Sequence, residues 1–207
     1  RAVVAAYYSE AGITIYHGDC ADVLPALDVK ANAVVTDPPY NVAFKYGGQT
    51  DDARPESDYF LWLKHRFVSC ADRLRPGGSL LWFWQFIRVA CGEVRDVLPA
   101  SCDVHFCGSW FQREFAGDRF TGTMPAISGG PIVWAVRTGA PASYHGPRGG
   151  HAGRQTLVGN HVRHDDGTGD HPCPRAFTIV RDAVRWVTPT GGLVIDPFLG
   201  SGTTLRA

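Results

Sequence analysis

The chain has 207 residues, of which 44% are hydrophobic and 19% are charged; this composition predicts one globular domain and excludes a disordered chain. Lys and Arg total 20, as do Asp and Glu, and the resulting net charge of zero excludes nucleic-acid binding through bulk positive charge, although not through a local basic surface. No apolar run approaches the roughly 20 residues that cross a bilayer, and the 6 cysteines are scattered, so we expect a cytoplasmic protein with free thiols.

The first half of the chain predicts alternating strands and helices. Phe60, Leu63 and Phe67 recur at helical spacing, and Pro76-Gly77-Gly78 is a turn signal after that helix. The segment 41–55 is rich in Gly and Asp and is expected to be a loop. In chain order we expect a strand at 13–16, a helix at 23–27, a strand at 33–36, a helix at 57–74 and a strand at 79–84.

The second half continues the alternation around two loop-like segments, 114–130 and 138–170. Its elements, in chain order, are a helix at 88–98, strands at 104–111 and 131–137, a helix at 176–187 and a strand at 193–195. This alternation predicts an α/β sheet with helices on both faces. Ligands of such sheets bind at the carboxyl ends of the strands.

Two polar clusters stand at predicted strand ends. The first is Asp37-Pro38-Pro39-Tyr40. Its prolines make the backbone rigid and remove two N–H donors, which leaves carbonyl oxygens and the Asp37 carboxylate as acceptors beside the aromatic face of Tyr40. This chemistry suits a planar ligand that carries an amino group, whereas the structural alternative is a strand-end turn with a packed tyrosine.

The second cluster, Asp196–Thr203, joins a strand to a predicted helix through Gly200 and Gly202. Glycines allow a tight turn and the close approach of a ligand to the backbone. No Lys follows them, which excludes the phosphate loop of a nucleotide hydrolase and favours a small-molecule cofactor. An ordinary strand-to-helix turn is the alternative.

Together the clusters resemble a known family. The sequence Val-Val-Thr-Asp-Pro-Pro-Tyr-Asn at 34–41 resembles the catalytic motif of the DNA amino-methyltransferases, which methylate the exocyclic amine of adenine or cytosine. The segment 196–203 is similar to their S-adenosylmethionine-binding motif, His171-Pro172 to the segment before it, and 75–80 to a further family turn. The catalytic motif precedes the cofactor motif, as in the permuted group whose recognition region lies between the two.

The resemblance implies one Rossmann-like methyltransferase domain over 1–207, with a catalytic part at 1–112, a DNA-recognition loop region at 113–170 and a cofactor-binding part at 171–207. In a methyltransferase of this family the Asp37 carboxylate and the Pro38 carbonyl accept the two N–H bonds of the target amine. Its nitrogen lone pair is thereby freed to attack the methyl group of S-adenosylmethionine. The implied catalytic residues are Asp37, Pro38, Pro39 and Tyr40.

The resemblance also implies the cofactor-binding residues Asp19, His171, Pro172, Asp196, Pro197, Phe198, Gly200, Ser201, Gly202 and Thr203. Asp19 follows a predicted strand, as does a family acidic residue near the cofactor's adenine, but it is equally suited to cap the next helix. The family normally places a further acidic residue about 20 residues beyond the glycines. The sequence ends at Ala207, so we expect a domain that is incomplete at the C-terminus, with weakened cofactor binding.

The implied substrate is double-stranded DNA with its target base flipped out of the duplex. Between Arg137 and His164 there are four Arg, four His and no acidic residue, a pattern that suits contact with phosphates, although a solvated loop is the alternative. The candidate DNA contacts are Lys45, Arg137, Arg148, Arg154 and Arg163. A homodimer and a cognate restriction nuclease are further partners that the family allows.

The aspartate of the catalytic motif favours adenine N6 as the target, because cytosine-N4 enzymes often have serine there. Cytosine N4 is the alternative, and a truncated relative that binds DNA without methylating it is a third hypothesis. Cys173 follows a proline, as does the nucleophile of cytosine-C5 enzymes, but it is not placed after the catalytic strand. The His and Cys residues lack the paired Cys-x-x-Cys spacing of common zinc sites, so we expect no metal.

Overall fold

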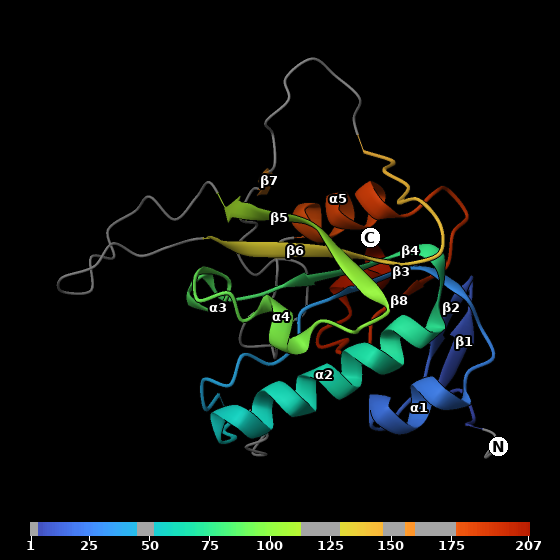
Figure 1. The fold of residues 1–207 in the computed structure, drawn as a ribbon. Helices are drawn as coiled ribbons and strands as arrows, with labels where there is room; N and C mark the ends of the chain where they lie inside the picture. Colours follow the sequence, from blue (N-terminus) through green and yellow to red (C-terminus); the bar gives the residue numbers. More distant parts are fainter. Residues whose placement is uncertain (1–3, 45–51, 113–128, 147–155, 160–176) are drawn as a thin grey trace.

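The computed structural model describes residues 4–44, 52–112, 129–146, 156–159 and 177–207. Within them a six-stranded sheet has the order β7-β5-β6-β4-β3-β8 (Figure 1). Its strands are β3 (Ala31–Thr36), β4 (Leu74–Phe83), β5 (Cys102–Gln112), β6 (Gly129–Arg137), β7 (Thr156–Gly159) and β8 (Val194–Ile195). A separate antiparallel hairpin consists of β1 (Tyr8–Glu10) and β2 (Ile13–Ile15).

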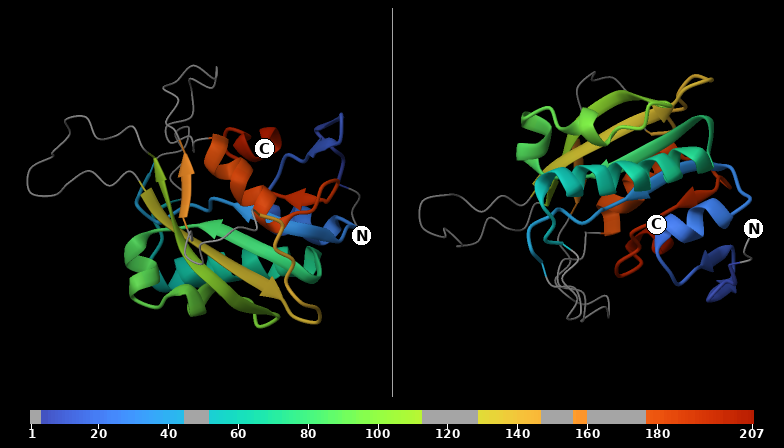
Figure 2. Two further views of the ribbon diagram at one scale, coloured as in Figure 1. Left: turned by 90° about the horizontal axis from the view of Figure 1, so that it is seen from above. Right: turned by 60° about the horizontal axis from the view of Figure 1, so that its bottom comes forward.

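Helices cover both faces of this sheet, as the alternation of elements predicts. Figures 1 and 2 show α2 along one face and α5 on the other. The helices are α1 (Cys20–Ala26), α2 (Glu56–Arg73), α3 (Phe86–Ala90), α4 (Val94–Val97) and α5 (Phe177–Val187), and a short 3₁₀ helix, η1 (Thr203–Arg206), ends the described chain. The predicted α/β class is therefore confirmed.

The sheet separates two hydrophobic cores, because successive side chains of a strand point to opposite faces. Val34 of β3 packs with α2, where Leu63 and Phe67 are fully buried. Ala33 and Val35 pack on the other face against α5. Since burying one such side chain contributes about 1.5–3 kcal/mol, the two cores hold β3 firmly at the centre of the fold.

The predicted turn at Pro76-Gly77-Gly78 lies inside β4 rather than before it. Residues Ala31 and Ala33 of β3 pair with Leu74 and Ser79 of β4, so the three turn residues form an irregularity in the ladder. Gly77 has a φ of +74°, and a Cβ there would come within 2.5 Å of the Pro141 carbonyl oxygen. The Pro76-Gly77-Gly78 segment thus bends the chain within β4 and does not separate two elements.

One other prediction differs from the structure, and two strands were missed. The helix expected at 88–98 is divided into α3 and α4, because Gly92 adopts a left-handed φ of +79° between them. Strands β1 and β7 were not predicted, since both are short and β7 lies within a segment that lacks hydrophobic alternation.

Candidate active site

The two predicted polar clusters meet at the carboxyl ends of neighbouring strands. β3 and β8 are parallel and adjacent, with Val34 opposite Ile195. Just beyond this pair, the Thr36 hydroxyl donates a hydrogen bond of 2.6 Å to Asp196 Oδ1. Residues 160 positions apart in sequence are therefore in direct contact, and the catalytic motif begins next to the cofactor motif.

Asp196 organises the turn that follows β8. Its carboxylate also accepts hydrogen bonds from the Phe198 backbone N–H (3.1 Å) and from the Thr204 hydroxyl (2.7 Å). Desolvation raises the pKa of Asp196 above its usual value, and the nearby carboxylate of Asp37 adds to this effect. The three donors oppose the rise because they stabilise the ionised form.

In the catalytic motif, the Tyr40 hydroxyl donates to Asp37 Oδ1 at 2.5 Å. The Pro39 carbonyl accepts from the Tyr59 hydroxyl of α2 at 3.0 Å. Burial raises the pKa of Tyr59 to about 12, so this phenol remains a neutral donor at physiological pH. Within the described chain no hydrogen bond engages the carbonyl of Pro38, which leaves that oxygen available as an acceptor.

Hydrogen bonds to Asp52, a residue that is only 2% exposed, hold the segment 41–44 in place. Its carboxylate accepts hydrogen bonds from the backbone N–H groups of Asn41 (2.5 Å), Val42 (3.1 Å) and Phe44 (3.4 Å). Asn41 has a φ of +60°, a conformation that costs energy for a residue other than glycine. The carboxylate compensates by satisfying three donors of the strained segment.

A buried arginine supports the same segment from α3. The Arg88 guanidinium pairs with Glu56 and with Glu93 (3.3 Å), and it donates to the Tyr40 carbonyl at 3.5 Å. The hydrogen bond from Arg88 lowers the pKa of Glu56. The backbone of Tyr40 is thus held by a charged network as well as by the strand before it.

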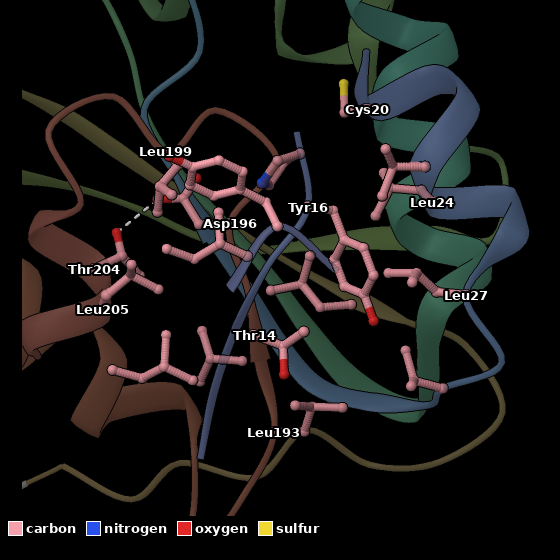
Figure 3. A pocket seen from close by; sticks show the side chains of 18 of the residues that line it. Thr14, Tyr16, Cys20, Leu24, Leu27, Leu193, Asp196, Leu199, Thr204 and Leu205 are labelled. Carbon is pink, nitrogen blue, oxygen red and sulfur yellow. Dashed lines mark hydrogen bonds between the residues drawn. The ribbon is translucent and has the colours of Figure 1, made fainter. Parts of the chain in front are cut away.

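A cavity of about 780 Å³ lies between hairpin strand β2 with helix α1 on one side and strand β8 with the chain after it on the other. Figure 3 shows Asp196, Leu199 and Thr204 lining one side of this cavity and Cys20, Leu24 and Leu27 the other. Of the predicted cofactor residues, Asp196 and Pro197 line it. Its volume falls in the range of small-molecule sites, about 300–1,000 Å³.

The two glycines of the turn after β8 adopt conformations that favour glycine. Gly200 and Gly202 adopt left-handed φ angles of +53° and +79°. Ser201 lies between the two glycines and Thr203 follows them, and the hydroxyl oxygens of these two residues are 3.2 Å apart. Phe198 does not line the cavity and instead packs against Trp62 of α2.

Asp19 caps helix α1, which was one of its two predicted roles. Its carboxylate accepts from the Ala21 backbone N–H at 2.8 Å and pairs with Arg66 at 3.1 Å. The first of these bonds is the main reason why the pKa of Asp19 is lowered. Its neighbours Gly18 and Cys20 line the cavity but Asp19 does not, so its contact with a cofactor stays a prediction.

Arg137 does not lie near the catalytic motif. Since Val136 pairs with Ser79, at the start of the regular part of β4, Arg137 is at the opposite end of the sheet from Asp37. Its guanidinium donates to the carbonyls of Ala71 (2.7 Å) and Leu74 (2.5 Å), at the end of α2. Arg137 therefore stabilises a helix terminus, and this position argues against its predicted contact with DNA.

Several predicted residues fall outside the described part of the chain: Lys45, Arg148, Arg154, Arg163, His171, Pro172 and Cys173. Among the described residues, no group of three or more His, Cys, Asp or Glu side chains could hold a metal ion. Burial raises the pKa of Cys20 to about 11, so the thiol in the cavity wall is protonated at neutral pH. None of the described helices has the length and apolar character needed to cross a membrane.

Sequence reasoning missed the residues that hold the motifs in place. Asp52 and Arg88 carry no local signal, because their partners lie at separations that follow no single helical or strand period, from 8 to 11 positions for Asp52 and from 3 to 48 for Arg88. One face of α2 carries a second pattern, Tyr59, Trp62 and Arg66, at positions i, i+3 and i+7. This spacing is visible in the sequence, but the apolar residues of the neighbouring face give the stronger signal.

Comparison with known proteins identifies the family. The model of a DNA methylase family matches residues 31–115 and 103–207, so the chain belongs to this family. A curated relative, the type II methyltransferase M.BglII of Bacillus subtilis, is 27% identical over 92% of this chain, and the chain spans 60% of that protein's length.

Two solved structures show the same fold. The complex of M1.HpyAVI with SAM has a TM-score of 0.65 at 18% identity, over 91% of this chain and 83% of that one. PvuII DNA methyltransferase, described as cytosine-N4-specific, has a TM-score of 0.66 at 16% identity, over 92% of this chain and 76% of that one.

Proposed function

We propose that this protein transfers a methyl group from S-adenosylmethionine to an exocyclic amine of a base in DNA, with adenine N6 as the favoured target. The observation that carries the proposal is the hydrogen bond from Thr36 to Asp196. It joins the strand that ends in an amine-binding motif to the strand that ends in a glycine-rich turn beside a cavity. Transfer between two bound molecules requires such adjacent sites.

The acceptors of the catalytic motif suit an amine. The Asp37 carboxylate and the Pro38 carbonyl would accept its two N–H bonds, while Pro39 is already engaged by Tyr59. This pairing localises the nitrogen lone pair, which is otherwise delocalised into the base. Catalysis then depends on positioning and on the negative charge near the amine, which becomes cationic as it reacts. Tyr40 would stack on the base.

The cavity fits the cofactor. Its walls are mainly apolar, from residues such as Leu24 and Leu199, and its polar groups include Asp196 and Thr204, which follow strand β8 next to the strand that ends in the catalytic motif. S-adenosylmethionine, when bound, supplies a methyl group activated by a sulfonium centre. The set proposed to hold it combines Asp196, Pro197 and the glycine turn with Phe198, Ser201, Thr203, Asp19, His171 and Pro172.

The choice of adenine rests on Asp37 at the head of the motif. Cytosine N4 is the second candidate, because a protein of the same fold is named cytosine-N4-specific and the fold itself does not choose between the two amines. We propose Lys45, Arg148, Arg154 and Arg163 as contacts to double-stranded DNA. The target base would leave the duplex at a cost of a few kcal/mol.

Methyl-labelled S-adenosylmethionine and unmethylated DNA test the proposal. After digestion to nucleosides, mass spectrometry identifies the labelled product. Asp37→Ala should abolish labelling, whereas Asp103→Ala, an exposed aspartate on β5, should leave it unchanged. Labelled N6-methyladenine supports the favoured target, labelled N4-methylcytosine supports the second candidate, and no label in either base refutes both.

A further inference from the structure

We infer that Trp62 of helix α2 is a positioning residue, which holds the catalytic motif and the cofactor motif at the separation and orientation that methyl transfer needs. The inference rests on the proposed function. Trp62 is half-buried and is not part of the cavity wall. Four side chains contact its indole ring, and each of them bonds to or belongs to a segment beside the proposed site: Arg54, Tyr59, Arg66 and Phe198.

Two of these neighbours lead to the catalytic motif. Tyr59 stacks with Trp62 at a centroid distance of 6.3 Å and an interplanar angle of 24°, and its hydroxyl donates to the Pro39 carbonyl. The Arg54 guanidinium lies 4.9 Å from the centre of the indole ring. The backbone N–H and carbonyl of Arg54 both bond to the Asn41 side chain, at 2.7 and 3.0 Å.

Another neighbour leads to the cofactor motif. The ring of Phe198 packs against Trp62 at a centroid distance of 5.7 Å. The backbone N–H of Phe198 donates to the Asp196 carboxylate, which lines the cavity. Trp62 thus packs against the turn that follows β8 without lining the cavity itself, and it orients this turn relative to α2.

The fourth neighbour leads to the opposite wall of the cavity. The Arg66 guanidinium lies 4.8 Å from the centre of the indole and pairs with Asp19, between cavity-lining Gly18 and Cys20. Tyr59, Trp62 and Arg66 follow one another at i, i+3 and i+7, so they form one stripe along α2. A single helix thus contacts the proposed base-binding segment and residues adjacent to both walls of the cavity, with Trp62 at the centre of the stripe.

The expected consequence follows from the geometry of methyl transfer. The amine and the methyl group must meet in line, and a misplacement of about 1 Å can cost on the order of 100-fold in rate. Trp62→Ala removes the ring that separates the two motifs. We expect kcat to fall about 10- to 100-fold, with the KM for S-adenosylmethionine within roughly threefold because the cavity wall is intact.

Matched variants separate positioning from stability. Leu61→Ala removes an exposed apolar side chain of the same helix and should leave kcat unchanged. Trp62→Phe keeps an aromatic ring and should recover most of the activity. Trp62→Leu keeps apolar volume without a ring, so it should show the loss even if Trp62→Ala does not fold.

Hydrogen exchange with S-adenosylhomocysteine supplies a readout that does not depend on turnover. In the wild type the compound should slow exchange at 196–206 and also at 37–44, residues that do not line the cavity. In Trp62→Leu the protection should persist at 196–206 and be lost at 37–44. Protection and kcat that both survive in Trp62→Leu would overturn the inference alone, whereas a wild type that does not bind the compound overturns the proposed function and the inference with it.

Discussion

The hydrogen bond between Thr36 and Asp196 can be tested by a pair of Thr→Val substitutions, which exchange a hydroxyl for a methyl group of similar size. Thr36 is 1% exposed and its hydroxyl is bonded to a carboxylate. Thr188 is 9% exposed, and its hydroxyl oxygen has no hydrogen-bond partner among the described residues. The two sites therefore differ mainly in whether a hydrogen bond is lost.

A hydrogen bond to a charged group contributes about 1.5–3 kcal/mol, and its loss here also removes one of three donors from the Asp196 carboxylate. We expect Thr36→Val to destabilise the protein by this amount, which for a chain of this length lowers Tm by about 3–12 °C. Thr188→Val should be neutral or slightly stabilising, because the hydroxyl that it removes is already unpaired.

The assay is equilibrium unfolding in urea, with Tm from calorimetry as a second measurement. Equal effects of the two substitutions would refute the reasoning, since the loss would then reflect the change of side chain and not the bond between β3 and β8. The methylation rate of Thr36→Val should also fall, because the two motifs are no longer joined at the ends of their strands.

Three further results are expected. Because folding raises the pKa of Asp196, its contribution to the free energy of unfolding is complete below the unfolded pKa of about 3.8. This contribution falls by about 1.4 kcal/mol for each pH unit as the pH rises from the unfolded to the folded pKa. Asp196→Asn stays neutral, so it should remove this pH dependence from unfolding curves measured between pH 3 and 7. Asp52→Asn retains one acceptor oxygen and should lose about 1–3 kcal/mol of local stability, seen as faster amide hydrogen exchange at 41–44, and an unchanged exchange rate would contradict its role in holding the segment after Tyr40. Iodoacetamide at pH 8 should alkylate exposed Cys91 well before Cys20, whose pKa is about 11, and rapid labelling of Cys20 in mass spectra would show that its thiol is not suppressed by burial.

Local patterns were sufficient to predict most of the elements and both motifs. The apolar run that became β3 and the helical spacing that became α2 depend on periodicity within a few residues, which is readable without any partner. The same holds for the prolines after Thr36 and for the glycines after Leu199, because these residues restrict or relax their own backbone. Where turn chemistry was used inside an element, as at Gly77 in β4, local rules placed the boundary wrongly.

What only the tertiary structure decided is which distant groups meet. The contact of Thr36 with Asp196 depends on strand order, and the position of Trp62 between Arg54 and Phe198 depends on how α2 packs. Arg137 is an example of a residue whose surroundings the sequence did not predict. It belongs to a basic region of the sequence, but in the structure its guanidinium binds carbonyls at the end of α2. The sequence thus determined which chemical groups are present and how the chain bends locally. Their separations follow from the packing of two cores against one sheet, and that is a property of the whole chain.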